Sequence, residues 1–366
     1  MPIADAYLYD AFAAFDFGAP VESAERFGQG HINDTYMLRT ASVDHRRFIL
    51  QRISPVAFQH PDQLMENVVR ITEYLSRELE KTGGDAERGT LHFLRARNGQ
   101  FFYLDPDGGA WRSYPFVGGT VCYETAETPE LFAASGKAFG RFQRLLQNYP
   151  AHTLYETIPR FHDTEDRFAK LQAAVAAAGP RRADCQREID FFFAREADCS
   201  VALQAQRDGI LPLRVTHNDT KLNNVLMDER TGEGVCIVDL DTVMPGLSIN
   251  DFGDSIRFGA NHSAEDEQDL SKVRLDLHLF ELYTQAFLEG AGGTLTDAEI
   301  AYLPWGAKLM TLECGMRFLT DHLEGDVYFH TTRENQNLDR CRTQCKLAAD
   351  MEAHWDEMTE IVQKYR

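Results

Sequence analysis

The spacing of apolar residues changes near residue 118, and this change constrains the fold more than any other feature. Between residues 21 and 117, short apolar runs such as "RRFILQRI" (46–53) are separated by turn residues, which is typical of strands. Beyond residue 118, longer segments carry apolar residues at helical spacing. Strands followed by helices indicate an α+β protein. We therefore expect a small β-rich N-lobe at 1–117 and a larger, mostly helical C-lobe at 118–366, with the boundary at Gly118-Gly119.

One helix interrupts the strands of the N-lobe. The segment "PDQLMENVVRITEYLSREL" (61–79) has apolar residues at Leu64, Val68, Ile71 and Leu75, a helical period. After it, Asn98-Gly99 is a hairpin-turn dipeptide between two apolar runs, so we expect a hairpin there. In the C-lobe we predict helices over 130–146, 166–178, 188–206, 270–290, 299–323 and 337–358.

The charge balance excludes some partners. The chain has 366 residues, 37 Lys and Arg, 57 Asp and Glu, and a net charge of -20. Binding to nucleic acid needs Lys and Arg for the phosphates, so this balance disfavours it. The N-terminus has neither the basic nor the apolar part of a signal peptide, and no run approaches the roughly 18 apolar residues of a membrane span. We expect a cytoplasmic monomer that binds neither nucleic acid nor membranes.

A polar stretch at residues 215–228, "VTHNDTKLNNVLMD", lies between two apolar edges. Its His217, Asp219 and Asn224 fit the kinase catalytic loop H-R-D-x-x-x-x-N, in which the Asp accepts the proton of the substrate hydroxyl and the Asn holds Mg²⁺. A hydroxyl nucleophile needs a carboxylate beside it, and Mg²⁺ needs hard oxygen ligands. By itself the stretch is also compatible with a polar loop between two strands.

A second acidic segment supports the catalytic interpretation. In "IVDLD" (237–241), Asp239 directly follows an apolar strand, where kinases place their Mg²⁺-binding Asp. Asp241 is a second candidate ligand because residues two apart share a strand face. ATP and Mg²⁺ are therefore the expected cofactors.

A glycine loop precedes both segments. Gly28 and Gly30 lie between two short strands, as a phosphate-covering loop requires, and Asn33 stands where a third glycine is expected. A basic residue should reach the phosphates from the next-but-one strand, which offers Gln51 and Arg52 but no Lys. We favour Arg52 because it alone carries charge, although the strand register leaves both open.

Two other N-lobe segments would complete the nucleotide site. Glu66, on the predicted helix, is placed to orient the phosphate-binding residue. The segment containing Tyr114, Phe116 and Val117 lies at the lobe junction, where we expect it to hold adenine.

Three motifs in this order, G-H-I-N-D-T-Y (30–36), T-H-N-D-T-K-L-N-N (216–224) and I-V-D-L-D (237–241), resemble those of the aminoglycoside phosphotransferase and choline kinase group. That group has a bilobal protein-kinase-like fold, and its glycine loop reads G-x-x-N-x-x-Y, so Asn33 fits it. The sequence of these motifs, together with the segments "DLDTVMPG", "DFGDSIRFGA" and "NLDRCRTQ", resembles bacterial N-acetylhexosamine 1-kinases more closely still. The resemblance spans residues 30–344 and implies ATP-dependent phosphorylation of the anomeric hydroxyl of GlcNAc or GalNAc.

The resemblance also implies roles for single residues. Asp219 would deprotonate the acceptor, and Asp251 would support the catalytic loop from beneath. Lys221 either touches the γ-phosphate or faces solvent. His217 is interpreted as structural. The chain departs from the wider kinase pattern in having no Lys on the strand of Gln51.

The acceptor site should lie in the helical lobe. Phe258 offers an aromatic wall, Arg317 a hydrogen-bond donor, and Tyr328 a stacking face, while His31 and Asp34 would reach the acceptor from the glycine loop. Glu313 lies four residues before Arg317 in an apolar helix, so the two side chains alternatively pair with each other. Other acceptors of this fold, such as choline, homoserine or an aminoglycoside, remain alternatives, as does a nucleotide-binding module without catalysis.

Overall fold

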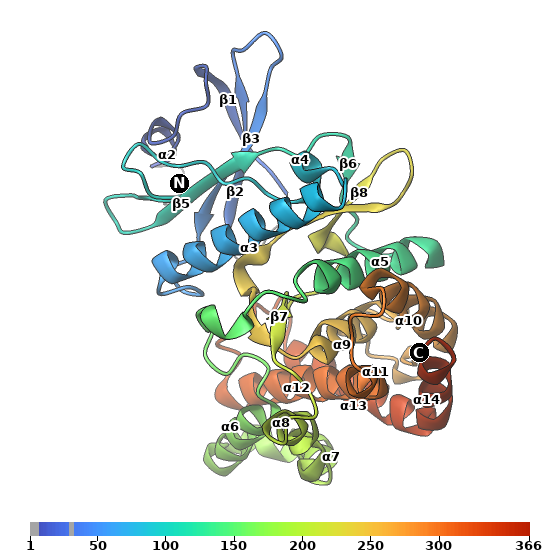
Figure 1. Cartoon of the computed structure of the whole chain (residues 1–366). Coiled ribbons are helices and arrows are strands. Elements are labelled where there is room, and N and C mark those ends of the chain that lie inside the picture. The colour runs from blue at the N-terminus through green and yellow to red at the C-terminus, as the bar shows by residue number, and fades with distance from the viewer. Residues whose placement is uncertain (1–6, 29–32) are drawn as a thin grey trace.

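The computed structural model describes residues 7–28 and 33–366. Its N-lobe is an antiparallel sheet with strand order β1-β2-β3-β5-β4 (Figure 1). The strands are β1 (Val21–Arg26), β2 (Asp34–Thr40), β3 (Arg47–Ile53), β4 (Tyr103–Leu104) and β5 (Ala110–Pro115). In the register of β3, Gln51 lies opposite Thr35 on β2 and Arg112 on β5.

Two different layers cover the two faces of this sheet. Helix α3 (Pro61–Lys81) packs its buried Leu64 and Ile71 with Ile49 and Ile53 of β3. On the opposite face, Leu50 joins a separate aromatic cluster with α2 (Leu8–Ala13). Because side chains alternate along a strand, Gln51 lies on the α3 face with Ile49, and Arg52 lies on the other face with Leu50.

The predicted helix at 61–79 is confirmed, but the predicted hairpin is wrong. The chain does turn at Asn98-Gly99, where the Gly99 N–H donates to the Ala96 carbonyl at 2.8 Å. The described residues directly before this turn form no strand, however, and β4 pairs with β5 across a later turn at 105–109. Asp105 stabilises that turn by accepting from the Gly109 N–H at 2.7 Å.

Short strands connect the two lobes. Strand β6 (Thr120–Val121) pairs with β8 (Val225–Asp228), which pairs with β9 (Gly234–Ile237), and β7 (Arg214–Thr216) pairs with β10 (Met244–Gly246). The predicted boundary at Gly118-Gly119 falls between β5 and β6. The catalytic-loop motif follows β7, and Asp239 follows β9, so the strand pairs bring two distant segments to the same place.

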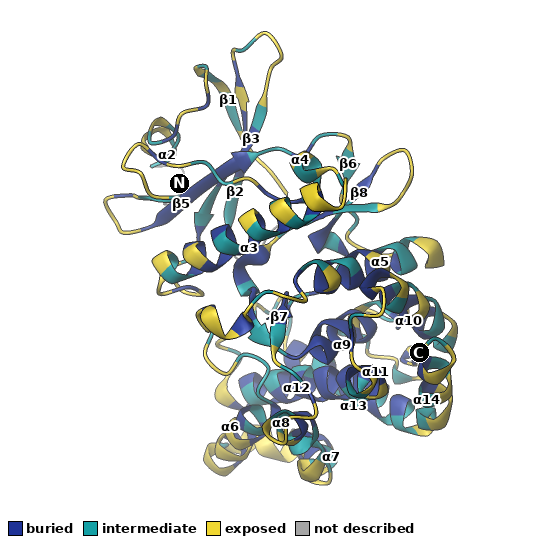
Figure 2. Ribbon diagram, in the orientation of Figure 1, coloured by how far each residue is buried: buried dark blue, intermediate teal, exposed yellow. Residues whose placement is uncertain are grey.

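The C-lobe is helical, as predicted (Figure 1). Its helices are α5 (Pro129–Leu145), α6 (Thr164–Ala177), α7 (Gln186–Phe193), α8 (Val201–Arg207), α9 (Ser248–Gly259), α10 (Leu277–Ala291), α11 (Asp297–Ala301), α12 (Leu303–Glu324), α13 (Gln336–Ala353) and α14 (Trp355–Lys364). Three long predicted helices are each divided in two, and the predicted 270–290 helix begins only after Asp276, which caps α10. Helices α9 and α12 are largely buried in the interior (Figure 2).

Two glycines permit the close crossing of α9 and α12. A Cβ on Gly306 would lie 2.1 Å from the Ile249 carbonyl oxygen, and one on Gly253 would lie 2.2 Å from the Gly306 oxygen. This contact places α9 and α12 in fixed relation to each other. None of the described helices is both long and apolar enough to cross a membrane.

Candidate active site

The catalytic-loop motif is held from beneath by Asp251 of α9. Its buried carboxylate accepts the N–H of His217 at 3.0 Å and of Asn218 at 2.8 Å, and Gln143 of α5 donates to it at 2.7 Å. Burial raises the pKa of Asp251, and these hydrogen bonds oppose the rise. This geometry agrees with the supporting role that the resemblance implied for Asp251.

Asp219 presents its carboxylate at the turn that follows. Lys221 Nζ lies 2.7 Å from one oxygen, and Asn224 Nδ2 donates to the other at 3.2 Å. Burial lowers the pKa of Lys221, but the charges of Asp219 and Asp254 outweigh burial and raise it. Lys221 is therefore a cation paired with the Asp219 carboxylate. His217 is buried and its Nε2 lies 2.9 Å from the Val238 carbonyl, so its role is structural.

Asn224 and Asp239 have the free oxygens that a metal requires. The Asn224 amide nitrogen faces Asp219, which leaves its oxygen available. Asp239 is held in a left-handed conformation (φ 55°), and its carboxylate accepts no hydrogen bond from the described residues. The Asp239 side chain is exposed to solvent. Protein atoms nevertheless lie close around it, and this partial desolvation, together with the charges of Asp241 and Asp219, raises the pKa of Asp239 to about 6.

The structure contradicts the prediction that Asp241 is a metal ligand. It lies in a short 3-10 turn (Leu240–Thr242) rather than on a strand, and it is 4% exposed. One carboxylate oxygen accepts from Arg112 NH1 and the other from Asn33 Nδ2 at 2.7 Å, so both oxygens already have donors. Among the described residues, no cluster of three or more His, Cys, Asp and Glu side chains forms a metal site. Asn224 and Asp239 would thus need substrate phosphates and water to complete an octahedral Mg²⁺ shell.

Arg112 is a site residue that the sequence analysis missed. It lies on β5, is 2% exposed, and donates to Asp241 and, through Nε at 3.0 Å, to Gln51. Burial opposes its charge, but Asp241 outweighs burial and raises the pKa of Arg112. The only sequence signal was an arginine within the apolar strand "AWRSYPFV", which does not identify a partner.

The structure contradicts two predictions for the nucleotide site: that Arg52 reaches the phosphates, and that Glu66 orients the phosphate-binding residue. Arg52 faces away from Asp241, and its Nε donates to Asp105 at 3.0 Å on the opposite face of the sheet. Glu66 is exposed and contacts Arg70 at 3.5 Å and Tyr155 at 3.3 Å, so it orients neither β3 residue. Gln51 is instead the β3 residue on the side of the lobe junction, because it accepts a hydrogen bond from Arg112.

The other predicted nucleotide residues surround this junction. Gly28 has a φ of 77°, which favours glycine, whereas Gly30 and His31 lie outside the described residues. Asn33 connects the end of the glycine loop to Asp241, and its Oδ1 accepts the Ser54 N–H at 3.0 Å. Tyr114 and Val117 are buried and Phe116 is half-buried, at the end of β5 and in the linker that follows.

The predicted acceptor residues lie around α12 and α9. The Arg317 guanidinium is 5.3 to 6.0 Å from the ring centres of Phe161, Tyr328 and Phe329. Tyr328 is 73% exposed and thus free to contact a ligand. Glu313 pairs with His162 at 3.2 Å and Arg167 at 3.7 Å, rather than with Arg317.

Phe258 and Asp34 lie elsewhere. Phe258 lines a cavity of about 540 Å³ that also borders Thr220 and Leu222 of the catalytic loop. Asp34, at the start of β2, pairs with Arg26 at 3.1 Å.

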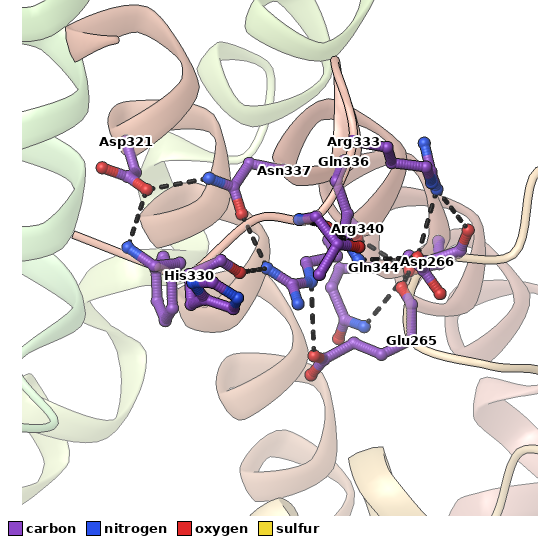
Figure 3. A network of polar contacts seen from close by, with 12 residues as sticks. Glu265, Asp266, Asp321, His330, Arg333, Gln336, Asn337, Arg340 and Gln344 are labelled. Carbon is purple, nitrogen blue, oxygen red and sulfur yellow. Dashed lines mark hydrogen bonds and ion pairs between the residues drawn. The ribbon is translucent and has the colours of Figure 1, made fainter. Parts of the chain in front are cut away.

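A polar network fixes the loop that carries Tyr328 (Figure 3). Asp321 accepts the N–H groups of residues 327, 328 and 329 at 2.7 to 2.9 Å and Asn337 Nδ2 at 2.8 Å. Arg340 donates to the His330 carbonyl at 3.2 Å, and Arg333 pairs with Asp266 and Asp339. Of the polar residues at 333–337, Arg333, Gln336 and Asn337 therefore hold the loop in place.

A two-lobed fold with this catalytic loop and Asp239 defines a small-molecule phosphotransferase of the protein-kinase-like fold. The chain belongs to the Phosphotransferase enzyme family, whose model matches residues 23–283.

Solved structures support the fold. An aminoglycoside phosphotransferase from Alicyclobacillus acidocaldarius is 13% identical, with a TM-score of 0.62 over 97% of this chain and 96% of that one. A microcompartment-associated aminopropanol kinase is 17% identical, with a TM-score of 0.59 over 97% and 98%. A spectinomycin phosphotransferase in complex with ADP and spectinomycin is 14% identical, with a TM-score of 0.53 over 92% and 95%.

Proposed function

We propose that this protein transfers the γ-phosphoryl group of ATP, with Mg²⁺, to the anomeric hydroxyl of an N-acetylhexosamine. Asp219 orients the hydroxyl and accepts its proton. An anomeric hydroxyl is more acidic than an ordinary alcohol, so a carboxylate is a sufficient base. Lys221 lies 2.7 Å from this carboxylate and places a cation beside the base.

The free oxygens of Asn224 and Asp239 would hold Mg²⁺, which when bound neutralises charge on the phosphates. Arg112 would take the place of the absent β3 lysine as the buried cation at the lobe junction. Gln51 orients Arg112 through their 3.0 Å hydrogen bond. The glycine loop beginning at Gly28 would cover the phosphates, and the segment 114–117 would hold adenine.

The position of Arg317 is the observation that supports a sugar as the acceptor. Its guanidinium already occupies the space among Phe161, Tyr328 and Phe329. Choline recognition uses aromatic faces to bind a cation, and here a cation of the protein occupies them. A guanidinium instead donates hydrogen bonds to hydroxyl and amide carbonyl oxygens. This arrangement favours a neutral, carbonyl-bearing sugar over an amine.

A panel of acceptors tests the proposal, with ATP consumption as the readout. We expect turnover with GlcNAc or GalNAc and little with choline, homoserine or an aminoglycoside. The position of transfer is checked by the acid lability of the product, because an anomeric phosphate hydrolyses in mild acid and a 6-phosphate does not. Turnover of an amine-bearing acceptor without turnover of either sugar would refute the sugar assignment and leave the kinase class intact.

Arg317→Met provides the matching variant. It should raise the KM for the sugar by about 10- to 100-fold, because it removes hydrogen bonds to charged donors worth about 1.5–3 kcal/mol. The KM for ATP should stay unchanged, since Arg317 lies in the C-lobe, away from the nucleotide residues. An equal increase in both constants would argue against acceptor binding by Arg317.

A further inference from the structure

His162 connects helix α12 to the catalytic loop. It lies in the segment that precedes α6, and its side chain is 11% exposed. Nδ1 lies 3.2 and 3.3 Å from the two carboxylate oxygens of Glu313 on α12. Nε2 lies 3.1 Å from the carbonyl oxygen of Asn218, the residue directly before Asp219.

These contacts determine the protonation of the ring. A carbonyl oxygen only accepts hydrogen bonds, so Nε2 must carry a proton. An ionised carboxylate also only accepts, so Nδ1 must carry one as well. Arg167 lies 3.7 Å from the same Glu313 carboxylate and pairs with it as well. His162 with a proton on both nitrogens is an imidazolium.

The charges around the ring agree with this state. Burial alone would lower the pKa of His162, but the charge and hydrogen bond of Glu313, together with the charge of Asp254 on α9, outweigh burial and raise it. Arg167 on α6 and Arg317 on α12 are cations that act on Glu313. Arg257 on α9 donates to Asp254 at 2.8 Å, and Lys221 also lies near Asp254.

The peptide that His162 contacts is the one that sets the direction of Asp219. Asn218 has a left-handed backbone (φ 65°), which requires support from its surroundings. The carbonyl of the Asn218–Asp219 peptide faces His162 at 3.1 Å, and its N–H donates to His217 Nδ1 at 3.3 Å. Both polar atoms of this peptide are thus held by imidazole rings.

We propose that His162, as an imidazolium paired with Glu313, is a positioning residue that orients the catalytic carboxylate of Asp219. This assignment rests on the proposed phosphotransfer. It adds a physical connection between Asp219, the proposed base, and α12, the helix on which Arg317 lies. Since a displacement of about 1 Å costs on the order of 100-fold in rate, loss of the link should lower kcat by about 10- to 100-fold.

The kinetic test is the pH profile of kcat for wild type, His162→Gln and Glu313→Gln. Gln keeps one N–H donor for the Asn218 carbonyl but carries no charge. We expect the wild-type kcat to fall as pH rises through the raised pKa of His162, because the imidazolium is then lost. In Glu313→Gln this fall moves to lower pH, and in His162→Gln it disappears while the KM for ATP stays unchanged.

A matched control is His354→Gln. The Nδ1 of His354 lies 2.9 Å from a backbone carbonyl and 3.8 Å from the Asp350 carboxylate, but it belongs to the junction of α13 and α14. Its pH profile should equal that of the wild type. A wild-type profile in His162→Gln, with unchanged kcat, would overturn the proposal.

A second readout does not depend on activity. In ¹⁵N-histidine NMR spectra at pH 6.5, the ordinary pKa of histidine, most His162 rings should carry protons on both nitrogens, and Glu313→Gln should lower that fraction. A single protonated nitrogen in the wild type would overturn the imidazolium. The NMR measurement needs no substrate, so its result holds even if no sugar is turned over. A failure of the proposed function can therefore be distinguished from a failure of the positioning role. The kinetic arm then uses whichever acceptor the panel identifies.

Discussion

Replacing Arg112 by Met tests which arginine serves the nucleotide site. The Arg112 guanidinium is 2% exposed and pairs with Asp241, which is 4% exposed. Met matches the volume of the arginine stem but removes the charge. The Asp241 carboxylate would keep only the Asn33 hydrogen bond of 2.7 Å, beside the like charge of Asp239.

Removing one partner of a buried ion pair costs about 3–5 kcal/mol, because the other charge stays buried and unpaired. We therefore expect Arg112→Met to lower the free energy of unfolding by that amount, measured by urea titration. The same variant should lower kcat/KM for ATP by at least about 10-fold, since the junction loses its buried cation. Asp241→Asn in the same chain should recover much of the stability and none of the activity.

Arg52→Met is the matched control, because Arg52 also forms a buried pair in the same sheet. Its partner Asp105 keeps hydrogen bonds from Trp111 Nε1 at 3.0 Å, Gly109 N at 2.7 Å and Asp107 N at 3.0 Å. The loss of stability should therefore be smaller, about 1.5–3 kcal/mol, the range for one charged hydrogen bond. kcat/KM for ATP should stay within about twofold. The reasoning is refuted if Arg52→Met lowers kcat/KM for ATP as much as Arg112→Met does.

Three further variants test other parts of the site. Asp219→Asn should lower kcat by about 10²–10⁴-fold, with unchanged ATP affinity by calorimetry, and unchanged turnover would remove Asp219 from its role as base. Gly306→Ala places a Cβ 2.1 Å from a carbonyl of α9 and should cost about 1–3 kcal/mol in thermal unfolding. Asp321→Ala frees three backbone N–H groups beneath Tyr328, so the acceptor KM should rise while the ATP KM holds; equal changes in both would contradict a local effect.

Much of the candidate site could be predicted from the sequence because its signals are local. His217, Asp219 and Asn224 lie within eight residues, and their spacing alone matches a kinase loop. Asp239 could be predicted because it directly follows an apolar run. The helix at 61–79 and the division into a β-rich and a helical part were likewise readable from residue spacing.

Strand register and long-range pairing were not predictable. A slip of one residue exchanges the faces of a strand, so the sequence could not decide between Gln51 and Arg52. Arg112 and Asp241 are 129 residues apart, and His162 and Glu313 are 151 apart. No local pattern identifies such partners.

The sequence by itself determined the order and chemical types of the catalytic groups, because these depend on side-chain identity and short spacing. Only the tertiary structure decided which charges face one another. It placed Arg112 against Asp241, Arg52 against Asp105, and His162 between Glu313 and the peptide before Asp219. The physical reason is that a buried charge is stable only when a partner is brought to it, and the packing of sheets and helices chooses that partner.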